Sequence, residues 1–363
     1  MRLASPLLKK VVYPCLAHSG YLRRRTAKGV AVVTYHGVLP AGYKAIDPVL
    51  DGSLVTADNF RRQLQLLHSH YNVISPAEFH LWCESKQDLQ SGSVLLTCDD
   101  ALQNSLSEMV PILQEARLSC LFFVTGASLC VEPLMLWYEE LHLMILVAAA
   151  NFSVDLPELG FHRRISSSTE KRFLWMNLTE KLSSLPWKER QGALEQIRTQ
   201  LDLSTEWKSH FLGSGDRRAR FLVLNPTELK LLSAANMSIG AHSVSHPMLS
   251  KMTQECAWEE IASSRSELEH FLGTEVWALA YPFGDTASVS KRELEMAERA
   301  GCKCAFLNIG GGFGPATSRF ALPRVHVTSE MSLAEFEAHV SGFYRSLRKH
   351  VLGEAQDAAM LRA

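Results

Sequence analysis

The stretch VLLTCDD (residues 94–100) joins a predicted buried strand to a pair of carboxylates. Its first five residues are nearly all apolar or small, which is typical of a parallel strand covered on both faces. Asp99 and Asp100 follow where such a strand ends. In parallel α/β folds the functional face lies at the carboxyl ends of the strands. The stretch therefore predicts one strand of a parallel sheet that delivers two carboxylates to a site.

Similar apolar runs recur along the chain. They cover residues 30–36, 120–126, 237–242, 276–284 and 302–311, with a weaker candidate at 71–75. Amphipathic patterns separate them, as in TADNFRRQLQLLHSHY and TQECAWEEIASSRSELEHFLG. Several runs also end in polar residues, among them His36 and His242. The alternation of strands and helices predicts a parallel α/β architecture, either a barrel or an open sheet.

Residues 130–225 interrupt this alternation. They contain three helical patterns, LMLWYEELHLMILVAAA, STEKRFLWMNLTEKLSSL and WKERQGALEQIRTQLDL, and no convincing strand. We interpret this segment as a helical insertion in the α/β domain. Trp137, Trp175 and Trp187 lie in it, and we expect them to pack rather than to line a substrate groove.

Composition and charge exclude several classes of protein. The chain has 363 residues, of which 47% are hydrophobic and 21% charged, as in a globular protein with a large core. Its formal net charge of -1 provides no electrostatic footprint for nucleic acid. No apolar run reaches the roughly 20 residues that span a bilayer. The 8 cysteines are scattered and expected to be reduced, which predicts a cytoplasmic protein.

The start of the chain is basic, because no acidic residue precedes Asp47. Such an arm is either solvated or lies on an anionic membrane as a peripheral contact. We therefore divide the chain into a basic arm at 1–29, a barrel at 30–350 interrupted by the insertion at about 130–225, and a tail at 351–363. The basic residues of the arm are Arg2, Lys9, Lys10, Arg23, Arg24, Arg25 and Lys28.

Two histidines complement the aspartate pair. IGAHSVSHPML (residues 239–249) places His242 and His246 four apart, and Pro247 disfavours a helix at His246. With one aspartate they form a two-histidine, one-carboxylate ligand set, which leaves open positions for water and substrate. The other aspartate can accept the proton of the activated water. Such a set suits Zn²⁺ best, and also Co²⁺, Ni²⁺ or Fe²⁺.

At these residues the chain resembles the polysaccharide deacetylases of the NodB-homology type. TCDDA (97–101), HSVSHP (242–247) and AYPFG (280–284) are similar to that family's motifs, and the resemblance covers residues 30–126 and 226–327. It implies a distorted (β/α)7 barrel with the helical insertion added. It also implies a metal-dependent hydrolase that removes N-acetyl, or O-acetyl, groups from a cell-envelope or exopolysaccharide-related sugar.

The resemblance implies roles for the paired residues. Asp99 corresponds to the general base, and Asp100, His242 and His246 correspond to the ligands of a divalent metal, most simply Zn²⁺. The metal and a backbone N–H near Tyr281 would then hold the oxyanion.

Three further assignments follow from the same resemblance. TYHGV places His36 in a motif that supplies the general acid in one branch of the family, and we favour it over His326 of LPRVHV because His36 ends a predicted buried strand. Tyr281 stands before Pro282, where some members carry an arginine that orients the base. Arg324 is the candidate to replace that arginine.

The chain departs from the family pattern at two positions. Cys98 replaces an aromatic residue and is expected to point into the barrel wall. Ala101 replaces a glycine, and at positive φ it would strain the loop by about 1 kcal/mol. These departures favour one alternative to the deacetylase, a catalytically impaired barrel that binds glycan or a partner protein. A second alternative is an amidase that acts on a non-sugar substrate, which the groove under the insertion would decide.

Overall fold

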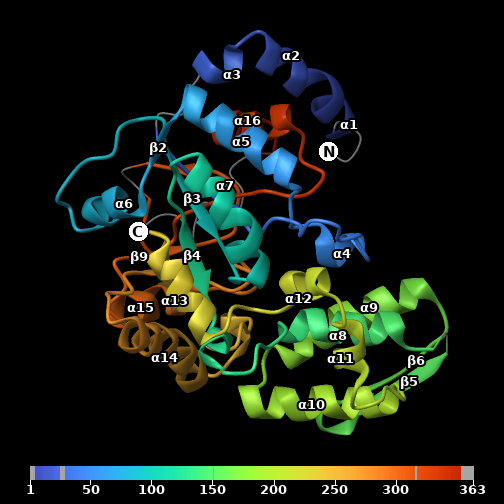
Figure 1. The fold of residues 1–363 in the computed structure, drawn as a ribbon. Coiled ribbons are helices and arrows are strands. Elements are labelled where there is room, and N and C mark those ends of the chain that lie inside the picture. The colour runs from blue at the N-terminus through green and yellow to red at the C-terminus, as the bar shows by residue number, and fades with distance from the viewer. Residues whose placement is uncertain (1–4, 25–28, 150, 315–316, 353–363) are drawn as a thin grey trace.

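The fold is built around a curled sheet with helices outside it. The computed structural model describes residues 5–24, 29–149, 151–314 and 317–352 (Figure 1). The strands follow the predicted apolar runs closely, and most of their residues are buried. They are β1 (Val30–Tyr35), β2 (Asn72–Ile74), β3 (Ser93–Cys98), β4 (Leu121–Val124), β7 (Ser238–Ala241), β8 (Ala278–Ala280), β9 (Cys304–Phe306), β10 (Gly312–Phe313) and β11 (Val325–His326).

The strands form one sheet in the order β10-β1-β3-β4-β7-β8-β9, with β11 beside β1 and β2 beside β3. Within the described residues, every pairing of this sheet is parallel except that of β1 with β10. A parallel bridge between Phe306 and Leu322, just before β11, brings the two ends of the sheet together. The predicted distorted α/β barrel is therefore confirmed.

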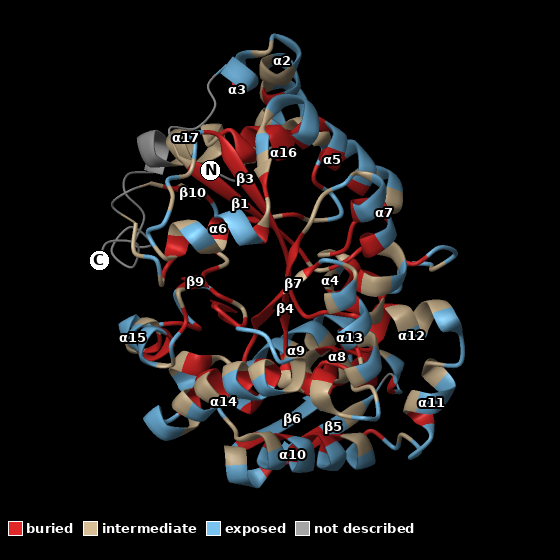
Figure 2. Cartoon of the chain, turned by 60° about the vertical axis from the view of Figure 1, so that its left-hand side comes forward, coloured by how far each residue is buried: buried red, intermediate tan, exposed pale blue. Residues whose placement is uncertain are grey.

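Helices cover the outside of the sheet. Figure 2 shows buried residues along the strands and on the inner faces of the surrounding helices, with exposed residues on their outer faces. Thr56 caps α5 (Ala57–His70), as its position before an apolar pattern predicts. The helices of the barrel are α4 (Pro48–Asp51), α5 (Ala57–His70), α6 (Pro76–Cys83), α7 (Val110–Glu115), α13 (Pro226–Ala234), α14 (Gln254–Leu272), α15 (Lys291–Arg299), α16 (Leu333–Val340) and α17 (Phe343–Leu352).

The segment between β4 and α13 forms a lobe with its own hydrophobic core, beside one end of the barrel (Figure 1). The three predicted helices are present. The lobe consists of α8 (Trp137–Val147), β5 (Phe152–Leu156), β6 (Phe161–Ile165), α9 (Ser168–Leu182), α10 (Trp187–Gln200), α11 (Trp207–Phe211) and α12 (Gly215–Phe221).

The prediction that this lobe contains no strand is wrong, because β5 and β6 form an antiparallel hairpin. Val154 and Leu156 are buried, whereas the intervening Asp155 is exposed. Gly160 supplies the left-handed turn residue, with φ of 57°. The alternation of buried and exposed residues in β5 is short and lies between two long helical patterns. It was therefore not recognised as the two-residue period of a strand.

The described part of the basic start is folded against the barrel. Helices α1 (Ser5–Leu7), α2 (Tyr13–His18) and α3 (Tyr21–Arg24) lie over α16, and Tyr13 and Leu22 are buried there. Arg23 pairs with Glu337 of α16 at 2.9 Å. Of the predicted tail at 351–363, residues 353–363 lie outside the described residues. In the described ranges no helix is both long and apolar enough to cross a membrane.

Candidate metal centre and active site

The polar residues predicted from the strand ends meet at one end of the barrel. His36 follows β1, Asp99 and Asp100 follow β3, and His242 follows β7. Because these strands are parallel neighbours, their carboxyl ends share one edge of the sheet. The local pattern of an apolar strand followed by a polar residue therefore predicts that these side chains lie at the same end of the barrel.

Asp100, His242 and His246 form a cluster with the geometry of a metal site. One ligand atom from each residue lies within 4.8 Å of the others, and all three residues are buried. Asp100 Oδ1 lies 3.5 Å from His242 Nε2 and 3.4 Å from His246 Nε2. The same Oδ1 is buried and has no hydrogen-bond partner among the described residues. An unpartnered carboxylate oxygen facing two imidazoles fits a divalent cation.

The second nitrogen of His242 defines its tautomer. His242 Nδ1 lies 2.8 Å from the carbonyl oxygen of Ala280. A carbonyl can only accept, so Nδ1 carries a proton, and Nε2 is the ring atom that faces Asp100 and is left to bind a cation. This arrangement is the one in which histidine binds a metal. For His246, burial lowers the pKa to about 3, so this ring is neutral near pH 7.

The loop that carries the two histidines is held from several sides. His246 N–H donates to Ser243 Oγ at 3.0 Å, and His246 lies outside any helix, as Pro247 predicts. Ser245 N–H donates to the Glu260 carboxylate of α14 at 2.8 Å. Gly126 permits close approach on the β4 side, because a Cβ there would lie 2.9 Å from the carbonyl oxygen of Val244. These contacts keep the two imidazoles in place before any ligand binds.

Arg324 binds Asp99. This is the contact expected if Arg324 replaces the family's arginine. The two guanidinium Nη atoms each donate to one carboxylate oxygen at 2.6 Å, and both residues are buried. Burial alone would raise the pKa of Asp99, but Arg324, together with His242, outweighs it and holds the pKa below its usual value. Asp99 is therefore ionised near pH 7 and has a fixed orientation, as a general base requires.

The two candidates for the general acid lie next to each other. The centroids of the His36 and His326 rings are 4.8 Å apart. His326 lies in β11, which pairs with β1 and so brings it beside His36. Burial, followed by the nearby His36, lowers the pKa of His326 to about 3. At neutral pH His326 is thus uncharged and has no extra proton to donate.

The backbone N–H and the hydroxyl of Tyr281 both take part in hydrogen bonds within the barrel. Its backbone N–H donates to Phe306 O at 3.1 Å within the sheet, and its hydroxyl donates to Phe320 O at 3.0 Å. The expectation that an N–H near Tyr281 holds an oxyanion therefore does not extend to the amide of Tyr281 itself. Pro282 carries no N–H. Their role in the structure is to shape the end of β8 beside His242.

Strained backbone gathers at the same end of the barrel. Ala101 has φ of 50°, so the strain expected where alanine replaces glycine is present. Cys98 is buried in the barrel wall, as predicted, with its thiol 3.8 Å from Ser105 Oγ. Other non-glycine residues of the site with left-handed φ are Asp100, Ser243, His246 and Phe283.

Three residues of the insertion contact the candidate metal site or the loop that carries its histidines, and no local sequence pattern predicts these contacts. The hydroxyl of Tyr138 lies 3.5 Å from Asp100 Oδ2. Trp137 Nε1 donates to the carbonyl oxygen of His246 at 2.9 Å. Arg190 Nη1 donates to the carbonyl oxygen of Ser245 at 2.7 Å. Trp137 is buried and packs as expected, but nothing in the local pattern indicated its partner.

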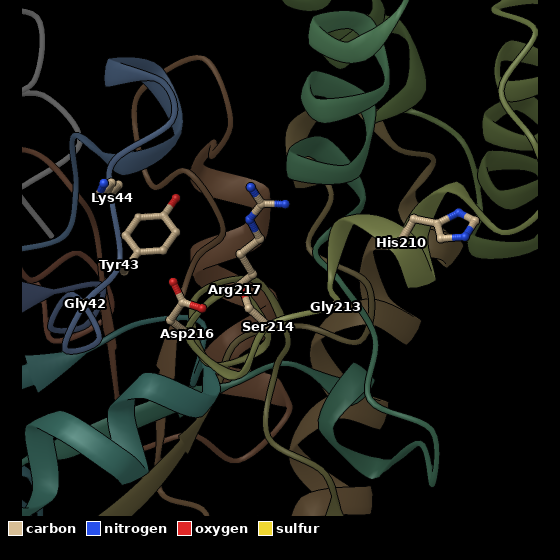
Figure 3. A pocket seen from close by; sticks show the side chains of 8 residues that line it. All are labelled: Gly42, Tyr43, Lys44, His210, Gly213, Ser214, Asp216 and Arg217. Atoms are coloured by element: carbon tan, nitrogen blue, oxygen red, sulfur yellow. The ribbon is translucent and has the colours of Figure 1, made fainter.

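A buried ion-pair network joins the insertion to α4 of the barrel. Arg220 of α12 donates to Asp51 at 2.8 Å and to Glu139 of α8 at 2.8 Å. Asp51 also accepts the hydroxyl of Tyr43 at 3.0 Å. An open cavity of about 440 Å³ lies on this seam, lined by Gly42, Tyr43, Lys44, His210, Gly213, Ser214, Asp216 and Arg217. In Figure 3, Tyr43 and Arg217 project toward each other, whereas the His210 ring points away.

A family model described as polysaccharide deacetylase matches residues 203–305, which include His242 and His246. Over residues 203–305 the chain is therefore similar to the polysaccharide deacetylases, in agreement with the motif resemblance. The predicted enzyme class, a deacetylase-like hydrolase, is confirmed by this match. A comparison with curated proteins found no match.

Solved structures support the fold. The deacetylase PplD of Streptococcus pyogenes, in complex with acetate, aligns with a TM-score of 0.53 at 17% identity and covers 86% of this chain and 98% of that chain. IcaB of Ammonifex degensii aligns with a TM-score of 0.53 at 15% identity, over 87% of this chain and 98% of that chain. A polysaccharide deacetylase of Bacillus cereus aligns at 0.51 with 16% identity, over 86% of this chain and 69% of that chain. At these identities the likeness concerns the fold.

Proposed function

We propose that this protein is a metal-dependent hydrolase that removes N-acetyl, or O-acetyl, groups from an acetylated sugar related to the cell envelope or to an exopolysaccharide. The observation that carries this proposal is the buried cluster of Asp100, His242 and His246 beside an ionised Asp99. The three clustered residues would hold the cation, most simply Zn²⁺. When bound there, such a cation supplies Lewis acidity to the acetyl carbonyl and to water.

The chain's own residues would move the protons. Asp99 accepts a proton from the attacking water while the hydroxyl adds to the acetyl carbon, and Arg324 keeps the carboxylate ionised and oriented. The C–N bond then breaks, and His36 donates a proton to the leaving nitrogen. The products are acetate and a free amine on the sugar. His36 is favoured over His326 because burial leaves His326 without a proton to donate.

The test compares metal content and acetate release in matched variants. We expect about one divalent ion per chain in the wild-type protein and none in the His242→Ala/His246→Ala variant. Asp99→Asn should keep the ion and lose acetate release from N-acetylated sugar oligomers. Failure of the wild-type protein to bind any divalent ion after reconstitution would contradict the hydrolase mechanism, and a glycan-binding barrel would then be the better interpretation. Metal binding with acetate release only from non-sugar amides would favour the amidase.

We further propose that the basic N-terminal helices contact an anionic membrane surface. Leu7 and Val11 are 59% and 48% exposed, the exposed Lys10 lies between them in sequence, and Arg24 is an exposed cation at the end of α3. Exposed apolar side chains among cations suit such a surface. The wild-type protein should float with vesicles that contain anionic lipid and not with neutral vesicles, and Lys10→Glu/Arg24→Glu should abolish flotation. Equal flotation of the variant would refute the contact.

A further inference from the structure

The carboxylate of Asp100 has two oxygens in two different environments. Oδ1 faces the two histidines and has no hydrogen-bond partner among the described residues. Oδ2 accepts the hydroxyl of Tyr138 at 3.5 Å. A carboxylate is free to rotate about its Cβ–Cγ bond unless its second oxygen is held. The contact with Tyr138 therefore restrains the plane of the carboxylate that faces the histidines.

The ring of Tyr138 also packs against the other side of the cluster. Its centroid lies 5.0 Å from the ring of His246 and 5.7 Å from that of Phe283. Tyr138 is thus in contact with both the carboxylate and one imidazole of the set. Since it comes from α8, it is a residue of the insertion rather than of the barrel.

Helix α8 is anchored so that Tyr138 cannot easily withdraw. On one side of it in sequence, Trp137 donates to the carbonyl oxygen of His246 at 2.9 Å. On the other side, Glu139 accepts from Arg220 at 2.8 Å. The carbonyl oxygen of Tyr138 accepts Trp175 Nε1 of α9 at 3.0 Å. Three successive residues are therefore fixed, and the position of the hydroxyl follows from them.

We propose that Tyr138 is a positioning residue for the carboxylate ligand Asp100, so that the helical insertion completes the metal centre of the barrel. This inference rests on the metal site proposed above. Hydrogen-bonding groups outside the ligand set orient metal-binding carboxylates and histidines, and losing one weakens metal binding or activity about 10- to 100-fold. The expected occupant is a divalent cation of the zinc type.

The test measures the dissociation constant for Zn²⁺ by competition with a chromophoric chelator. Tyr138→Phe removes the hydroxyl and keeps the ring against His246. We expect Zn²⁺ binding to weaken about tenfold or more at unchanged stoichiometry. In the Co²⁺-substituted protein, the visible absorption bands should also shift, because they report the geometry of the ligands. A purely structural role of the hydroxyl would lower thermal stability without moving these bands.

Tyr43→Phe is the matched control. Tyr43 likewise donates to a buried carboxylate, Asp51, at 3.0 Å, but Asp51 is not a member of the cluster. This variant should bind Zn²⁺ as tightly as the wild-type protein. Wild-type affinity and wild-type Co²⁺ bands in Tyr138→Phe would overturn the role of Tyr138 while leaving the metal site intact. Absence of Zn²⁺ binding in the wild-type protein would instead remove the proposed metal centre, and the inference with it.

Discussion

Arg324 and Asp99 are 225 residues apart in the chain and meet through two parallel hydrogen bonds of 2.6 Å. Arg324 precedes β11, Asp99 follows β3, and both strands flank β1. The pair places a charged guanidinium behind the candidate base. We propose that Arg324 takes the place of the family's arginine before the proline, from a different point in the sequence.

Replacing Arg324 with glutamine should shift the acid limb of the pH–rate profile. Because Arg324 lowers the pKa of Asp99, its removal raises that pKa. Asp99 accepts a proton only when ionised, so activity will be lost at a higher pH as the solution is acidified. The measurement is kcat/KM for acetate release as a function of pH. Arg324→Lys restores the charge but not the bidentate geometry and should recover part of the shift. Superimposable acid limbs would contradict this role of Arg324.

The roles of His36 and His326 can be distinguished with two substrates whose leaving groups differ in their need for a proton. His36→Gln should lower kcat for an N-acetylated sugar about 100-fold or more, since the leaving amine then lacks a proton donor. The same variant should retain hydrolysis of an activated aryl acetate, whose leaving group needs no proton. His326→Gln serves as the comparison, and it should affect the two substrates equally. If His326→Gln, and not His36→Gln, selectively lost activity on the N-acetylated sugar, His326 would be the general acid.

Arg220 should be essential for stability because it neutralises two buried carboxylates. Arg220→Met leaves Asp51 and Glu139 without their cation, and burial already raises the pKa of Glu139 despite the neighbouring arginine. We expect a loss of about 3–5 kcal/mol in the free energy of unfolding, measured with urea. Arg62→Met, at an exposed position of α5, is the control and should be nearly neutral. Equal midpoints for both variants would show that the network contributes little.

His339 should make the protein less stable in acid. Burial, with Lys9 nearby, lowers its pKa to about 4, whereas an unfolded histidine has a pKa of about 6.5. Between these values the unfolded chain binds the additional proton, so stability falls as the pH is lowered through this window. His339→Phe keeps the stacking on Tyr344, whose ring centroid is 4.2 Å away, and removes the titration. The variant should lose less free energy of unfolding than the wild-type protein between about pH 7 and about pH 5. If the variant and the wild-type protein lost the same free energy of unfolding, His339 would not be the group responsible.

The structure of the insertion was only partly predictable from local sequence patterns. Its helices follow from their apolar spacing, and they form where expected. The hairpin of β5 and β6 was missed because only Val154 and Leu156 mark the inner face of its first strand, between two strong helical signals. Tyr138 was missed for another reason. In sequence it is one apolar position of an amphipathic helix, and only the docking of α8 on the barrel brings its hydroxyl to Asp100.

Local sequence patterns are sufficient to predict the barrel and the chemical groups at the carboxyl ends of its strands. Apolar runs specify buried parallel strands, and a polar residue after such a run is carried to a common edge by the topology, so Asp99, Asp100 and His242 could be placed together without coordinates. Only the tertiary structure decided which groups touch. The pairing of Arg324 with Asp99 and the approach of Tyr138 to Asp100 depend on side-chain packing between segments far apart in the chain, to which local periodicity is insensitive.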